Sequence, residues 1–227
     1  MKKNLLITAA MALTSFGAFA QGYITMATST HRFWDCFTVP GVGINAATMD
    51  YAVYWGATTL TDPLSSIGTQ FGQSACPANQ QVATNGVVNL PATYSAINTL
   101  LTGGGFTLGS FNGTAQIGTT SASGSAGFGT TQFTGTVGGD QYQMIVVAWD
   151  AASGTSALVN DTYRAIGWSN PFNYTMGASA NDPVGQTLLS ATGLMNQFGV
   201  MSPVPEPGTL ALAAIGGASL LLFRRKK

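Results

Sequence analysis

The stretch QYQMIVVAW, residues 141–149, decides the fold class of this chain. Its centre, residues 144–148, is an unbroken apolar run, which is typical of a strand buried on both faces. A second strand is predicted at residues 49–57, MDYAVYWGA, where period-two spacing separates two faces. One face carries Met49, Tyr51, Val53 and Trp55, and the other carries Asp50, Ala52 and Tyr54. The two stretches predict the centre of a β-sheet.

The rest of the body follows the same pattern. Further strands are predicted at residues 22–28, 32–39, 163–168 and 194–201, and hairpins are predicted across the Gly/Thr/Ser-rich residues 106–137. Turns are expected at residues 150–154 and 170–172, and an irregular loop at residues 60–85. Residues 91–101 predict one short helix that ends at the glycines 103–105, with a strand and turn as the alternative. We therefore expect an all-β domain over residues 21–202, a β-sandwich of which the jelly roll is one form.

The charges of the body differ from those of the whole chain, whose formal net charge is zero. Six of the eight bases lie at the two ends, so Arg32 and Arg164 face eight acids between residues 21 and 206, a balance of −6. Phosphate neutralisation needs clustered lysine and arginine, so nucleic acid is excluded as a partner. A body without lysine also excludes a lysine Schiff base. The low charged fraction, 7 %, is typical of an exported β-domain rather than a cytosolic enzyme.

The first twenty residues have the three parts of a secretory signal peptide. Lys2 and Lys3 form a basic start, residues 5–16 are apolar, and Ala18 and Ala20 form a small-x-small cleavage box. Cleavage is predicted between Ala20 and Gln21, with an uncleaved N-terminal anchor as the alternative.

The two cysteines, Cys36 and Cys76, lie in the part that would be exported, where disulfides persist. A bridge between them would close a loop of about 40 residues and stabilise the fold by up to about 4 kcal/mol. Two free thiols are the alternative.

The last residues, 203–227, combine three features. The box Val204, Pro205, Glu206 and Pro207 cannot continue a helix and stays extended. The uncharged residues 209–223 predict a short transmembrane helix of roughly 22 Å, against roughly 30 Å for the hydrocarbon core. The cations Arg224, Arg225, Lys226 and Lys227 would then act as a stop-transfer signal on the cytoplasmic side. A single-pass anchor that stays attached is the plain physical interpretation.

Taken together, this tail resembles the PEP-CTERM sorting signal of exported bacterial proteins. The resemblance covers about a tenth of the chain, from the Pro-Glu-Pro box to the basic end. It implies processing by an exosortase-type membrane enzyme, transient membrane attachment, and association with extracellular polysaccharide at the cell surface or in the matrix. The body also resembles, loosely, a group of exported β-domain proteins of unknown function.

We predict no catalytic, cofactor-binding or metal site in the body. The single histidine, His31, lies near Asp35, but no nucleophile elbow accompanies it, and a surface position is the simpler interpretation. The seven aspartates of the body are scattered beside turn-forming residues, so turn chemistry is favoured over a pair of acids for glycoside hydrolysis. Calcium binding through Asp140, Asp150 or Asp161 is an alternative without a matching loop motif.

The aromatic residues are the remaining candidates for binding. Trp34, Trp55, Trp149 and Trp168 could form a stacking platform for sugar rings, although aromatics in strands mostly fill cores. Glycosylation sequons begin at Asn112, Asn160 and Asn173, and chance explains them in so threonine-rich a chain. We therefore predict a structural or adhesive surface protein without catalysis. A carbohydrate-binding module is the alternative, and a secreted hydrolase is a weaker one.

Overall fold

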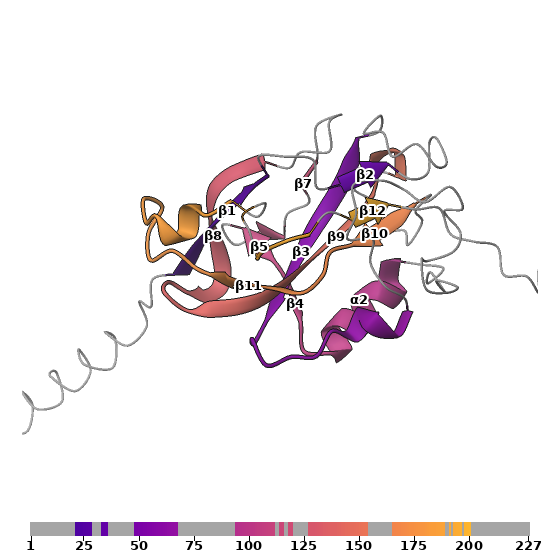
Figure 1. The fold of residues 1–227 in the computed structure, drawn as a ribbon, viewed down its shortest axis with the longest axis horizontal. Coiled ribbons are helices and arrows are strands. Elements are labelled where there is room, and N and C mark those ends of the chain that lie inside the picture. Colours follow the sequence, from indigo (N-terminus) through magenta and orange to yellow (C-terminus); the bar gives the residue numbers. More distant parts are fainter. Residues whose placement is uncertain are drawn as a thin grey trace, which may run out of the picture.

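The computed structural model describes residues 21–28, 33–35, 48–67, 94–111, 114–115, 118–119, 127–153, 165–188, 191, 193–196 and 198–200. Most of these residues form strands in several sheets, so this part of the chain is all-β (Figure 1). The predicted signal peptide, both cysteines and the C-terminal tail lie outside the described residues.

A six-stranded sheet forms the centre, with the order β10-β9-β3-β4, and with β11 also pairing β9 and β7 also pairing β3. Its strands are β3 (Met49–Gly56), β4 (Thr107–Leu108), β7 (Gly118–Thr119), β9 (Gln141–Asp150), β10 (Ile166–Trp168) and β11 (Phe172–Thr175). A four-stranded sheet, in the order β1-β8-β5-β6, contains β1 (Gln21–Ala27), β8 (Gly127–Val137), β5 (Ser110–Phe111) and β6 (Thr114–Ala115). A parallel pair joins β2 (Phe33–Asp35) to β12 (Phe198–Val200).

The two strands predicted most strongly pair with each other. β3 and β9 are antiparallel over eight residue pairs, from Met49 opposite Asp150 to Gly56 opposite Gln143. All of residues 144–148 are fully buried, as the apolar run predicted. Because both faces of this strand are covered, residues on both faces must be apolar, and the run lacks the apolar–polar alternation of a half-exposed strand.

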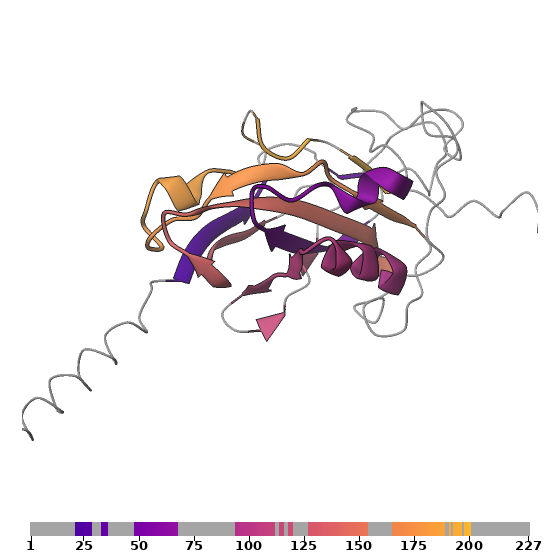
Figure 2. The ribbon, with the colours of Figure 1, turned by 90° about the horizontal axis from the view of Figure 1, so that it is seen from below.

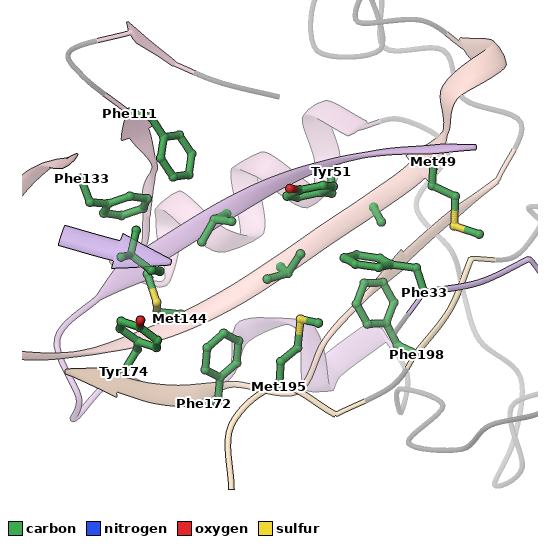
Figure 3. Packing of buried hydrophobic residues seen from close by; sticks show 14 of the residues in the cluster. Phe33, Met49, Tyr51, Phe111, Phe133, Met144, Phe172, Tyr174, Met195 and Phe198 are labelled. Atoms are coloured by element: carbon green, nitrogen blue, oxygen red, sulfur yellow. The ribbon is translucent and has the colours of Figure 1, made fainter. Parts of the chain in front are cut away.

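Two hydrophobic clusters lie on the two faces of this central pair. The first contains Met49, Tyr51 and Val53 of β3 together with Phe111 and Phe133 of the four-stranded sheet, and Trp55 packs against it. Figure 3 shows Met49, Tyr51, Phe111 and Phe133 among the side chains of this cluster. The second contains Ala52 and Tyr54, with Ile97 and Leu101 of the helix α2. The predicted division of β3 into two faces is therefore confirmed. One face is covered by strands, and the other by a helix.

The helix α2 (Tyr94–Gly103) confirms the predicted helix and excludes the strand-and-turn alternative. It runs alongside the strands in Figure 2. Its end is a Schellman motif, in which Phe106 N–H donates to Leu101 C=O at 2.9 Å and Gly105 N–H donates to Thr102 C=O at 3.0 Å. Gly105 has φ 89°, a left-handed conformation that glycine adopts without strain. Three short 3₁₀ helices complete the described elements, namely η2 (Pro63–Ile67), η3 (Ala151–Ser153) and η4 (Val184–Gln186).

The turn predicted at residues 170–172 was wrong, because the chain does not reverse there. β10 and β11 both run antiparallel to β9, with Trp168 opposite Val147 and Phe172 opposite Met144. The intervening chain on the β10–β11 side holds one residue more than the facing stretch of β9, which makes a β-bulge. Pro171 lies in it, where the missing N–H costs no ladder hydrogen bond. The predicted strands at residues 163–168 and 194–201 are present as the shorter β10 and β12.

Candidate functional site

Three of the aspartates that the structure describes, Asp62, Asp150 and Asp182, hold turns. Asp62 Oδ1 accepts a hydrogen bond from Leu64 N–H at 3.0 Å, and Asp150 Oδ1 accepts one from Ala152 N–H at 3.0 Å. The Asp182 carboxylate accepts from Ala178 N–H at 2.8 Å and from Val184 N–H at 3.1 Å. These bonds support the turn interpretation of the aspartates.

The pKa values of these carboxyl groups respond to their surroundings. The two backbone donors lower the pKa of Asp182, because they favour its charged form. Partial burial raises the pKa of Asp62, against the opposing effect of the hydrogen bonds from Leu64 and Ser65. In a catalytic pair of acids, each carboxylate shifts the pKa of the other. No second carboxylate contributes to the pKa shift of Asp62 or of Asp182.

Two candidate calcium ligands lie far apart. Asp140 precedes β9 and Asp150 ends it, so the length of the strand separates them by on the order of 30 Å. The third candidate, Asp161, lies outside the described residues, as do His31 and the cysteines. In the described part of the chain, no three His, Cys, Asp or Glu side chains gather into a group that could hold a metal.

Two buried carboxylates lie near each other in the backbone. Asp50 is 4 % exposed and Asp150 is 2 % exposed, and they occupy neighbouring register positions on β3 and β9. On β3, Asp50 lies on the face opposite to that of Met49 and Tyr51, which belong to the first cluster. On β9, Asp150 lies on the same face as Val146 and Ala148, which also belong to the first cluster. The two carboxylates therefore project from opposite faces of the sheet and do not form an acid pair in one cleft.

The tryptophans divide into two pairs. Trp149 and Trp168 are buried, at 0 % and 4 % exposure, within the cluster that α2 covers. Trp34 and Trp55 are partly buried and belong to different sheets. The Trp55 ring meets Phe133 and Tyr142 edge-on, at centroid distances of 6.3 and 5.2 Å. Trp55, Trp149 and Trp168 are thus engaged in packing.

A hollow of about 220 Å³ lies beside β11, and sequence reasoning missed it. Its lining includes Gln141, Asn173, Thr175, Val184, Thr187 and Leu194, none of which is charged. Val184 is the one large hydrophobic side chain that is exposed in the described part of the chain, at 45 %. Only the sequon beginning at Asn173 pointed to this region. Its asparagine is exposed on β11, while Asn112 and Asn160 lie outside the described residues.

The hydroxyl of Tyr174 closes the inner side of this region. It lies 3.0 Å from Gly185 C=O and 2.9 Å from Thr187 C=O, to either of which it can donate. It also accepts a long hydrogen bond, 3.4 Å, from Thr25 N–H on β1. Burial raises the pKa of this hydroxyl, and the bond from Thr25 opposes that effect. Tyr174 thereby connects the central sheet to the four-stranded sheet.

The C-terminal signal lies outside the described residues, and so does the predicted span at residues 209–223. None of the helices in the described ranges has the length and hydropathy needed to cross a membrane. Comparison with curated proteins and with solved structures finds no match to the chain. The family model of the PEP-CTERM protein-sorting motif, PEP_exosort_dom, matches residues 203–226. The chain therefore carries a PEP-CTERM sorting motif, which marks it as an exported protein sorted through an exosortase-type enzyme.

Proposed function

We propose that this protein is a structural or adhesive component of the cell surface or the extracellular matrix, without catalytic activity. The observation that carries the proposal is the sorting motif at residues 203–226. The body over residues 21–202 would be the exported cargo. The tail would hold it at the membrane through residues 209–223 until the processing enzyme acts at the box of Pro205, Glu206 and Pro207.

The start of the fold supports the proposed export. β1 begins at Gln21, the first residue after the predicted cleavage site, and Gln21 lies opposite Val137 of β8. The first described strand thus lies entirely within the predicted mature chain. Removal of residues 1–20 would cost the described fold none of its strands.

A β-sandwich is the architecture that we infer for the whole body. Its support is the first cluster, in which side chains of the central sheet pack against Ile24, Phe111 and Phe133 of the four-stranded sheet. The helix α2 and the second cluster add a further layer on the opposite face.

The two alternatives have less support. A carbohydrate-binding module that uses tryptophan stacking would need open indole rings, whereas Trp149 and Trp168 are buried and Trp55 packs against two aromatic rings. A secreted hydrolase would need two convergent acids, whereas Asp50 and Asp150 project from opposite faces. Structural use of the body requires neither feature.

The test is intact-mass analysis of the protein recovered from its native host. We expect a chain that begins at Gln21 and has lost the segment after the Pro-Glu-Pro box. The matched variant P205A/E206A/P207A should keep its tail and stay in the membrane fraction, since the recognition box is gone. Recovery of the wild-type chain from cytosol with residues 1–227 intact would reject export. A surface-located protein that turns over glycosides would reject the non-catalytic role alone.

A further inference from the structure

We propose that the β2–β12 end of the body is the surface that the exosortase-type enzyme contacts while it processes the Pro-Glu-Pro box, with Trp34 as the central residue of the contact. β12 is the last described strand and ends at Val200, five residues before Pro205. The proposal adds a surface of the folded body to the linear motif. It rests on the sorting route of the proposed function, but not on what the exported body does afterwards.

The covalent chain limits how far the box can lie from the body. Five residues span at most about 18 Å, whatever their conformation. A domain as long as residues 21–202 has a radius of gyration of about 16 Å. Val200 is fully buried, so part of the span is used before the chain reaches the surface. An enzyme that binds Pro205 must therefore lie against the end of the body from which β12 leads.

Packing holds β12 in place. Phe198 is 1 % exposed, and its ring meets that of Phe33 edge-on at a centroid distance of 5.0 Å (Figure 3). The backbone of Gly199 lies closely against that of Gly167. Release of β12 would lengthen the connection to the box, but it would also expose Phe198 and Val200 to water. The short connection is therefore a property of the folded body.

Trp34 lies beside the point where the chain leaves the fold. In the parallel ladder it pairs with Gly199, one position before Val200. Phe33 packs in the first cluster, and neighbouring residues of a strand point to opposite faces, so Trp34 points away from that cluster. Trp34 is partly exposed and is not among the described side chains of either cluster. Tryptophan is enriched among the residues that carry most of the binding energy of protein interfaces.

Val184 offers a matched control at a different place on the body. Its side chain is apolar and 45 % exposed. It belongs to η4, which packs against β1, where the Thr25 hydroxyl donates to Gly185 C=O at 2.9 Å. Figure 1 shows β1 and the β2–β12 pair toward opposite ends of the described body. An enzyme held at the β2–β12 end would therefore not contact Val184.

The test follows removal of the tail in the native host, by pulse labelling and intact-mass analysis, at two spacings. One series keeps the native connection, and the other carries a flexible Gly/Ser segment of about twenty residues after Ser202. We expect W34A to slow tail removal at least about threefold at the native spacing, and the added segment alone to slow it as much, because a long linker lowers the effective concentration of the body at the enzyme. In the lengthened chain W34A should have no further effect. V184A should be processed at the wild-type rate.

A lengthened wild-type chain that is processed as fast as the native one overturns the proposal, and this measurement needs no substitution in the fold. An equal loss in W34A at both spacings also overturns it, because a folding fault would act at either spacing. The variant W34A/P205A/E206A/P207A should stay in the membrane fraction as P205A/E206A/P207A does. Its loss from that fraction would show that Trp34 contacts lipid instead of the enzyme.

These contrary results would leave the proposed function intact. A wild-type chain that keeps its tail would instead reject the processing step of the proposed function, and this contact with it.

Discussion

The hydroxyl of Ser169 accepts a hydrogen bond from the backbone N–H of Val146, at 2.9 Å. In the opposite direction Ser169 N–H donates to Val146 C=O at 2.8 Å, as in an ordinary ladder. The side chain thus takes the place of the Ser169 carbonyl at the bulge, and then donates to Asn170 C=O at 2.9 Å. Ser169 is fully buried, so the Ser169 hydroxyl, rather than water, satisfies Val146 N–H.

The substitution S169A should destabilise the fold by about 1–3 kcal/mol, because it leaves the buried Val146 N–H without an acceptor. The measurement is chemical denaturation followed by tryptophan fluorescence. S65A is the matched control, since the Ser65 hydroxyl donates to Asp62 C=O at an exposed site. An equal loss in the two variants would show that the bulge does not depend on Ser169.

The close approach of β10 and β12 depends on Gly167. A Cβ added there would lie 2.1 Å from Gly199 C=O, and the obstructing atoms belong to the backbone. We expect G167A to cost about 2 kcal/mol or more, because overpacking against a backbone cannot be relieved by a side-chain rotation. G103A is the control, since a Cβ at Gly103 meets nothing within 4 Å. If the two variants melt together, β12 does not dock on β10 in solution.

Alkaline pH should destabilise the protein through Tyr51. Burial raises the pKa of this hydroxyl well above its usual value of about 10, so the folded protein keeps a proton that the unfolded chain releases. The stabilising effect is complete below about pH 10 and is lost as the pH rises toward the folded-state pKa, by about 1.4 kcal/mol per pH unit.

Denaturation of wild type and Y51F at pH 8, 10 and 11 measures this effect. The phenylalanine variant cannot ionise at this position, so its stability should fall less steeply. Parallel curves for the two proteins would mean that Tyr51 keeps its ordinary pKa in the fold.

The predicted bridge between Cys36 and Cys76 has a direct chemical test. We expect no reactive thiol when the exported protein is unfolded without reductant, and two after reduction. The variant C36S/C76S should lose up to about 4 kcal/mol of stability, since the loop between the cysteines is then unrestrained. Two reactive thiols in the unreduced protein would refute the bridge.

The sequence alone determined the strands that a hydrophobic pattern within a single short segment predicts. The apolar run at residues 144–148 required burial on both faces, and the alternation from Met49 to Trp55 separated two clusters. Gly105 ended α2, as the glycine cluster predicted, because few other residues adopt its conformation. The sorting motif at residues 203–226 could also be predicted from the sequence, since a sorting enzyme recognises the linear peptide itself.

The tertiary structure alone decided which residues meet across the chain. Pro171 indicated a turn, because its missing N–H is visible in the sequence itself. The hydrogen bond from Val146 N–H to the Ser169 hydroxyl joins two distant segments, so it could be recognised only in the folded structure. Asp50 and Asp150 are 100 positions apart and become neighbours on opposite faces. Pairing is set by the sum of many weak contacts between distant segments, and no local pattern contains that sum.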